Sequence, residues 1–249
     1  MKKAERIGEK NINHQGLEME IIDYKDRRNM EVRFSDGFIF HGASYHNFLT
    51  GSLTSLLFPD FLGVGCIGVG EYKSRENKIK TTAYIKWTSM LTRCYSDKYI
   101  KQQNYNSCVV CDEWLNFQNF AKWHYENYYE IEDDCLELDK DIIEKGNRIY
   151  SPNKCIYVPH KLNTILCNRH NDRGKCLIGV SKRDGKYSAA CSVDGKSKYL
   201  GMFDSEYEAF LVYKAKKESE IKRVAEQYRG RIPDYIIELI KRYKVEMTD

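Results

Sequence analysis

Two predicted strands followed by a predicted helix, within about thirty residues, most constrain how this chain can fold. Residues 137–143 and 148–158 each have the apolar content of a short strand, and Gly146-Asn147 between them is typical of a turn. Pro159 suits the first turn of a helix, because proline has a fixed φ and no amide hydrogen to donate. The sequence therefore predicts a ββα unit in the middle of the chain.

Residues 1–58 have the pattern of a small β module. Short strands are predicted at 17–22, 30–34 and 38–43, and Asp36-Gly37 between the last two is a hairpin signal. No combination of residues in this module indicates catalysis.

Three glycines after this module formally match a dinucleotide-binding fingerprint. Gly63, Gly65 and Gly68 have the spacing G-x-G-x-x-G, but residues 71–76 are polar and lack the apolar period of a helix. Because the fingerprint needs a helix to open there, we expect a loop or a strand edge and no nucleotide site.

Two amphipathic helices are predicted between this loop and the ββα unit. Thr81 or Thr82 can cap the first helix, and Asp112 can cap the second. Aromatic residues at this spacing usually form core, so His124 is expected to be a packed or boundary residue. The inward faces are predicted to consist of Tyr84, Trp87, Leu91 and Cys94 in the first helix, and of Trp114, Phe117, Phe120 and His124 in the second.

The composition is that of a folded protein. Apolar residues make up 42% of the 249 residues, charged residues 31%, and there are only 4 prolines, which excludes a disordered or collagen-like chain. No run of about 18 apolar residues is present, and the charged N-terminus is not followed by an apolar stretch. We therefore expect a cytoplasmic protein without a membrane partner.

Charge is distributed unevenly although the net charge is only +4. Residues 126–144 contain nine acidic residues and one basic residue, whereas residues 168–200 are mainly basic. An acidic segment can hold a cation and a basic one can face phosphate. The alternative is that both are solvated faces.

Nine cysteines, an odd number, favour reduced thiols over a disulfide framework. Cys108 and Cys111 have the spacing of zinc ligands, but no second close pair completes a tetrahedral site. Structural zinc is therefore the less favoured alternative to buried thiols.

The motifs between residues 84 and 163 form a specific combination. They are Trp87, Met90, Arg93-Cys94-Tyr95, Val110-Cys111, Glu113-Trp114, Phe117, Phe120, Trp123, Leu138-Asp139-Lys140-Asp141, Gly146-Asn147, Tyr150-Ser151-Pro152, Cys155-Ile156-Tyr157-Val158-Pro159 and Asn163. This combination resembles the HNH-like proteins of bacteriophages and other mobile elements, which implies a phage-encoded protein acting in a bacterial host cell.

The resemblance implies a metal-dependent site. In HNH nucleases the ββα unit holds one divalent metal, such as Mg²⁺, against the scissile phosphate while a histidine activates water. Asp139 and Asn163 occupy the metal-ligand positions of the pattern. Asn147 or Asn153 occupies the position that orients the base.

This chain departs from the pattern at the base itself. Lys140 stands where an active HNH enzyme has its histidine, and a lysine amine between Asp139 and Asp141 is expected to stay protonated. Cleavage could persist if His160, one helical turn before Asn163, acts as the base, or if a metal-bound hydroxide attacks without one. The favoured expectation is a ββα unit that docks on DNA without cutting it.

A second resemblance covers about fifty residues of the basic region. Its motifs are Gly179-Val180, Gly185-Lys186-Tyr187, Ala189, Gly195-Lys196, Leu200-Gly201-Met202-Phe203, Ser205, Glu208-Ala209 and Tyr213. They resemble the AP2/ERF-type DNA-binding domain, in which three antiparallel strands are backed by an amphipathic helix. Such a sheet can read a major groove, which is wide enough to admit strands.

Strand alternation sorts the side chains of this predicted sheet. Tyr187, Ala189, Cys191 and Val193 are expected to face the helix, with residues 186, 188, 190 and 192 on the open face. Lys182, Arg183 and Lys198 are expected to extend that open face. Arg183 is the expected base reader, because its guanidinium can bond guanine through two hydrogen bonds. The candidate DNA-binding residues are Lys182, Arg183, Lys186, Ser188, Lys196, Lys198 and Tyr199. A last amphipathic helix, beginning near Ile232-Pro233, is expected to pack back on this module.

Together these features predict an α+β protein with three domains, at residues 1–58, 59–170 and 171–249. The expected partner is double-stranded DNA. The alternative is a non-catalytic inhibitor or regulator that uses the HNH-like frame to bind a host defence protein or nuclease.

Overall fold

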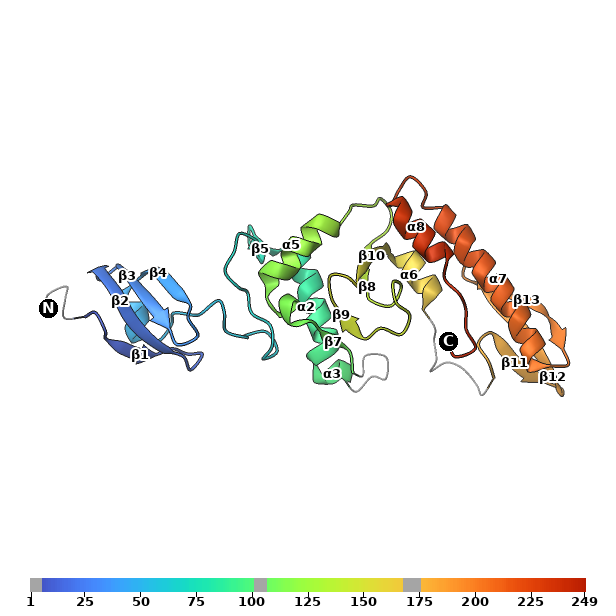
Figure 1. Cartoon of the computed structure of the whole chain (residues 1–249), viewed down its shortest axis with the longest axis horizontal. Helices are drawn as coiled ribbons and strands as arrows, with labels where there is room; N and C mark the ends of the chain where they lie inside the picture. The colour runs from blue at the N-terminus through green and yellow to red at the C-terminus, as the bar shows by residue number, and fades with distance from the viewer. Residues whose placement is uncertain (1–5, 101–106, 168–175) are drawn as a thin grey trace. The chain divides into compact units, whose positions relative to one another are not determined.

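The computed structural model describes residues 6–100, 107–167 and 176–249, which form a mixed α+β structure with several small sheets (Figure 1). The predicted α+β class is confirmed. The chain divides into two compact units, Met1–Glu126 with Arg148–Pro152, and Asn127–Asn147 with Asn153–Asp249. None of the helices in the described residues has the length and apolar character needed to cross a bilayer.

The elements of the first unit are β1 (Lys10–Ile12), β2 (Glu18–Asp26), β3 (Asn29–Phe34), β4 (Ile39–Ala43), α1 (Tyr45–Leu49), β5 (Arg75–Glu76), β6 (Ile79–Lys80), α2 (Thr82–Tyr95), α3 (Asp97–Ile100), β7 (Val109–Val110), α4 (Asp112–Leu115), α5 (Phe117–Asn127) and β9 (Ile149–Tyr150). Those of the second unit are β8 (Leu136–Asp139), β10 (Ile156–Pro159), α6 (His160–Leu166), β11 (Val180–Arg183), β12 (Lys186–Val193), β13 (Lys196–Phe203), α7 (Glu206–Glu226) and α8 (Asp234–Lys241).

Strands β1 to β4 form one antiparallel sheet in sequential order. The three strands predicted here are confirmed, and β1 adds an edge strand that the sequence did not indicate. Alternate residues of β2 and β3 are buried together with Phe48 of α1, which gives this sheet a core of its own. At the predicted hairpin, the Asp36 carboxylate accepts a hydrogen bond from the Phe38 amide, and Gly37 takes a φ of +91°.

The prediction of α2 is confirmed, and that of the next helix is wrong in one respect. Thr81 caps α2 through its side chain. Cys111, not Asp112, is the cap residue of α4, and the expected single helix breaks at Asn116. The break follows from pairing, because Asn116 forms a parallel bridge with Cys66 and its side chain then accepts from the Gln118 amide.

The glycine-rich loop serves packing. Gly65 pairs with Phe61 in a short bridge and lies against α2, where a Cβ atom would be 2.9 Å from the Trp87 ring. No helix opens from the loop, as its polar continuation predicted. The residue without a side chain is therefore needed for close approach to α2, and the fingerprint match is accidental.

The two predicted strands of the ββα segment are shorter than expected. β8 ends at Asp139, and the expected strand 148–158 divides into β9 and β10. β8 pairs with β10 in antiparallel register, whereas β9 pairs in parallel with β7. A loop of turns and bends occupies residues 140–148, and Pro159 is the cap residue of α6, close to its predicted place.

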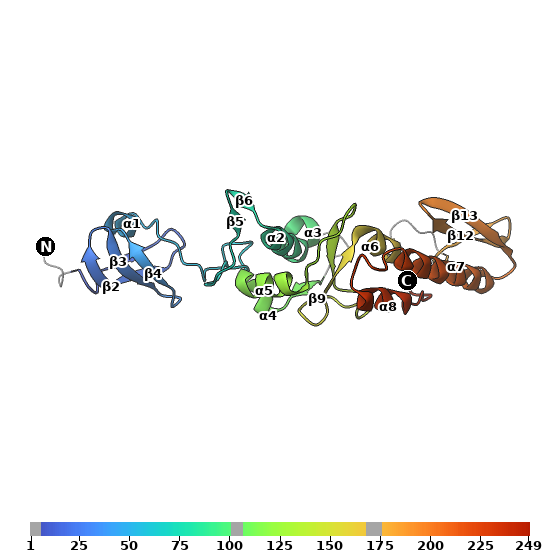
Figure 2. The same ribbon diagram turned by 90° about the horizontal axis from the view of Figure 1, so that it is seen from above.

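Strands β11, β12 and β13 form an antiparallel sheet with α7 along one side (Figure 2). Ala189 and Cys191 are buried against Ala209, Phe210 and Tyr213 of α7. Gly179 has a φ of +74°, and a Cβ atom there would overlap the Tyr213 ring. Close approach of the chain to α7 therefore requires glycine at this position.

Helix α8 packs on α7, as predicted for the last amphipathic segment. A buried cluster combines Val158 of β10, Leu162 of α6, Val224 of α7 and Ile237 of α8. The core of the second unit thus includes residues on both sides of the predicted boundary near residue 170.

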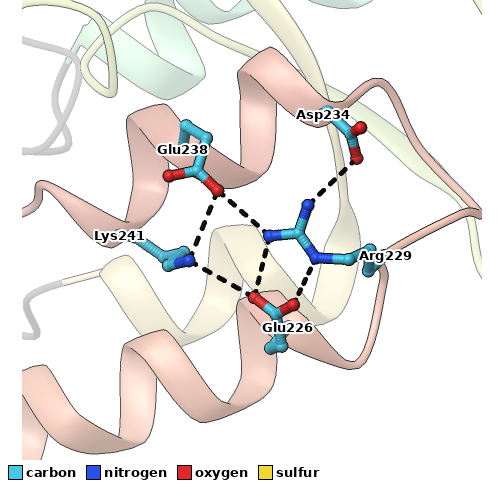
Figure 3. Close-up of polar contacts among 5 residues, drawn as sticks. All are labelled: Glu226, Arg229, Asp234, Glu238 and Lys241. Atoms are coloured by element: carbon cyan, nitrogen blue, oxygen red, sulfur yellow. Dashed lines mark hydrogen bonds and ion pairs between the residues drawn. The ribbon is translucent and has the colours of Figure 1, made fainter.

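An ion-pair network joins the end of α7 to α8 (Figure 3). Arg229 binds Glu226, Asp234 and Glu238, and Lys241 binds Glu226 and Glu238 at 3.4 and 3.3 Å. All five side chains are at least about one-third exposed, so the network supplements the apolar contacts between these helices and does not replace them.

Candidate nucleic-acid interface

Asp139 ends β8, where the resemblance places a metal ligand. Its Oδ1 accepts hydrogen bonds from the amides of Asp141 and Ile142, at 2.7 and 2.8 Å. Burial raises the pKa of this carboxyl, and the two amides oppose that effect because they stabilise the ionised form. Asp139 thus shapes the turn that follows it.

Lys140 is buried, with 8% of its surface exposed, and its Nζ lies 2.6 Å from Oδ2 of Asp141. The amine therefore donates to a neighbouring carboxylate at the position where an HNH enzyme presents its base. A buried ammonium is stable only when it is paired and hydrogen-bonded. The contact thus joins Lys140 to one of the two acids that flank it.

Of the two candidate asparagines, Asn147 is the one that acts on this loop. Its Nδ2 donates to the Lys140 carbonyl at 2.9 Å, and its amide donates to the Glu144 carbonyl at 3.0 Å. The residue is buried, whereas Asn153 lies exposed on a later turn. Asn147 thus fixes the backbone at the position of the expected base.

Glu137 is the residue of this site that the sequence analysis missed. Its two carboxylate oxygens lie 2.5 Å from Nδ1 of His160 and 2.5 Å from Nδ2 of Asn163. One strand residue therefore holds two residues of α6. The signal was available, because Glu137 and Asp139 are two apart on a strand and so share a face.

Both residues expected to bind a metal have hydrogen-bond partners within the protein. The amide nitrogen of Asn163 faces Glu137, and Oδ1 of Asp139 faces two amides. Within the described residues no group of three or more His, Cys, Asp or Glu side chains could hold a metal ion, and this includes Cys108 and Cys111. Divalent-metal binding at Asp139 and Asn163 stays a prediction.

The C-terminal sheet presents the second candidate surface, and its register decides which residues share a face. Directly paired residues of antiparallel strands point to the same side. Arg183 pairs with Lys186, and Tyr199 pairs with Ala190, so these residues and Ser188 lie on the side away from α7. Tyr199 is 63% exposed.

The expected placement of Lys182 and Lys198 on this open face is wrong. Lys182 pairs with Tyr187 and Lys198 pairs with Cys191, whose side chains pack toward α7. Lys196, opposite Val193, belongs to the same side. The irregularity between Ala189 and Ala190 shifts the register of β13 by one residue, which alternation along a single strand cannot reveal.

Positive charge remains accessible on the open face. Arg183 and Lys186 flank a two-residue turn in which Asp184 and Gly185 take φ angles of 50° and 78°. Lys186 pairs with Asp204 at 3.0 Å, but both side chains are more than half exposed, so water and salt weaken this contact. Like charges directly opposite each other destabilise a hairpin, so the Arg183–Lys186 pair is not explained by stability of the sheet.

Comparison of the chain with models of protein families, with curated proteins and with solved structures finds no match.

Proposed function

We propose that this protein binds double-stranded DNA through the open face of the β11–β13 sheet and does not cleave it. The observation that supports this function best is the Arg183–Lys186 pair, two cations directly opposite each other at one end of an exposed face. Ser188 and Tyr199 continue that face along the sheet. A duplex phosphate backbone would relieve the repulsion that the pair creates.

The chemistry of this face suits a duplex groove. A major groove is about 12 Å wide and admits strands, so a short sheet can bring side chains to base edges. Arg183 can bond guanine through two hydrogen bonds, while Lys186 supplies charge to phosphate. Lys182 and Lys198, on the other side of the sheet, are better placed for phosphates beside the groove than for bases.

The ββα unit supports docking without hydrolysis. Lys140 is engaged by Asp141, and the polar side chains around it hold one another and the loop. His160 is the remaining candidate base, with Nδ1 held by Glu137 and a side chain that is more than half exposed. A carboxylate at Nδ1 orients a histidine as a general base requires, so cleavage is tested directly.

The binding test uses the full chain and a mixed-sequence DNA duplex of about 30 base pairs, titrated at several salt concentrations. Arg183→Gln with Lys186→Gln should weaken binding about tenfold and lower the salt slope by about two. The matched control, Lys10→Gln with Arg33→Gln, removes one lysine and one arginine that form ion pairs on the N-terminal sheet. Equal affinities for the two variants would refute the assigned face.

The cleavage test incubates supercoiled plasmid with the protein and Mg²⁺ or Mn²⁺. We expect the plasmid to stay intact. Nicking that is lost in both Asp139→Ala and His160→Ala would show that the protein is a nuclease with His160 as its base. Salt-resistant binding of a host protein, with only weak DNA binding, would instead favour the inhibitor.

A further inference from the structure

A second basic hairpin lies in the other unit of the chain, where the sequence analysis assigned no function. Strands β5 and β6 pair through Arg75 with Lys80 and through Glu76 with Ile79. Lys73 precedes the hairpin and Lys78 lies in its turn, so four cations fall within residues 73–80 against the single acid Glu76. All four cations are exposed.

The positions of the cations work against the stability of the hairpin. Arg75 and Lys80 are direct partners, so two positive side chains stand side by side on one face. Like charges in this position destabilise a strand pair. The same arrangement occurs in the Arg183–Lys186 pair of the C-terminal sheet.

The turn of this hairpin also has a residue that is unfavourable for its backbone conformation. Asn77 and Lys78 both have positive φ angles, 49° and 68°, as in the tight turns that favour asparagine followed by glycine. Lysine replaces glycine at the second position although its Cβ is strained there. Ile79 beside it is 74% exposed. Residues that break local rules together mark candidate functional sites.

The base of the hairpin is firmly held, so its tip is presented in a defined place. The Thr81 hydroxyl donates to the Lys73 carbonyl at 3.0 Å, and the Thr81 amide donates to the Ser74 carbonyl at 3.1 Å. Gln118 of α5, which is buried, bonds both the amide and the carbonyl of Tyr72 at 3.0 Å. A held β-hairpin loses little conformational freedom on binding.

We propose that the β5–β6 hairpin is a second, independent contact for double-stranded DNA, with Arg75, Lys78 and Lys80 on the phosphates. Within the described residues, Arg75 and Lys78 form no ion pair, and Lys80 only approaches the Tyr84 ring. A two-stranded ribbon fits the major groove of B-form DNA, whereas the narrow major groove of A-form RNA excludes it. The exposed Ile79 adds an apolar contact at the tip.

The test compares Arg75→Gln with Lys80→Gln against the wild type and the Lys10→Gln with Arg33→Gln control, on the same DNA duplex. The hairpin variant should bind about tenfold more weakly and lose about two from the salt slope. Its Tm should be unchanged or higher, because the like-charge pair is gone. An affinity and a salt slope equal to those of the control would overturn the proposal. So would an RNA duplex whose binding is weakened by the hairpin substitutions as much as that of DNA.

The two sets of variants test the hairpin and the C-terminal sheet face separately. If only the Arg183→Gln with Lys186→Gln variant binds weakly, the hairpin proposal fails and the proposed function stands. If only the hairpin variant binds weakly, the hairpin proposal holds and the assigned sheet face fails.

The turn offers a second, sharper variant. Lys78→Gly removes one charge and one strained side chain, so it should raise Tm while lowering DNA affinity about threefold. A higher Tm with unchanged affinity would overturn the role given to Lys78.

Discussion

The ββα loop and the C-terminal sheet are the two regions whose sequence motifs led us to expect a DNA-associated protein, yet they use their polar residues in opposite ways. In the loop, Glu137 holds His160 and Asn163, and Asn147 holds the Lys140 carbonyl. In the sheet, by contrast, Arg183 and Lys186 project from an exposed hairpin end. One region satisfies its own hydrogen bonds, and the other exposes its charged side chains to solvent.

This difference separates residues that keep a shape from residues that meet a ligand. Polar groups that are buried and paired stabilise a loop, since leaving one unpaired would be costly. Exposed cations that lie opposite each other destabilise a strand pair, and the weak contact of Lys186 with Asp204 offsets this only in part, so the proposed phosphate partner would relieve it. The polar residues of the loop therefore stabilise its structure, whereas those of the sheet suit the DNA contact that we propose.

The largest effect on stability should come from the contact between Gly179, which precedes β11, and the Tyr213 ring of α7. Gly179→Ala places a Cβ in the Tyr213 ring at a positive φ, so it should lower the free energy of unfolding by about 3 kcal/mol. The control is Gly185→Ala, which has a similar φ of +78° but nothing within 4 Å, and should lose only about 1 kcal/mol. Chemical denaturation measures both. Equal losses would show that close packing on α7 does not hold the open face in place.

A smaller effect is expected from the loop. Asn147→Ala removes the donor to the buried Lys140 carbonyl and should lower the free energy of unfolding by about 2 kcal/mol. Asn153→Ala changes an exposed side chain and should stay within about 0.5 kcal/mol of the wild type. Denaturation of the two variants side by side checks this. If Asn153→Ala lowers the free energy of unfolding more than Asn147→Ala does, the hydrogen bond from Asn147 to the Lys140 carbonyl does not stabilise the loop.

The sequence predictions that were confirmed depend on local patterns. The cap at Thr81, the Asp36-Gly37 hairpin and the order of strands β11 to β13 followed by helix α7 each depend on neighbours in the chain. Predictions failed where a distant segment decides the outcome. Asn116 pairs with Cys66 and interrupts a helix, and β9 pairs with β7 and so leaves the ββα segment.

The candidate sites show the same limit. Alternation along β12 correctly placed Ala189 and Cys191 toward α7, because one strand suffices for that prediction. Predicting which face Lys182 and Lys198 occupy requires the register between strands, and the sequence of one strand does not give that register. The spacing of Glu137 and Asp139 indicates a shared face, but the contacts of Glu137 with α6, more than twenty residues later in the chain, cannot be inferred from one strand.

The smallest effect concerns Asp139 and gives the loop its pH dependence. Burial raises the pKa of this carboxyl, so the folded protein takes up a proton more readily than the unfolded chain. The contribution of Asp139 to stability is therefore greatest at low pH and is lost as pH rises through its raised pKa. Asp139→Asn keeps an oxygen that can accept from the amides of Asp141 and Ile142.

For this variant we expect a free energy of unfolding at pH 7 that is not lower than that of the wild type, and a flatter profile from pH 4 to about 7. Urea denaturation across that range, with and without Mg²⁺, measures both. A marked loss of stability at pH 7, or stabilisation by Mg²⁺ that the substitution abolishes, would mean that the carboxylate charge has a partner outside the loop. The ββα unit would then hold a ligand as the sheet is proposed to do, and the contrast between the two regions would fail.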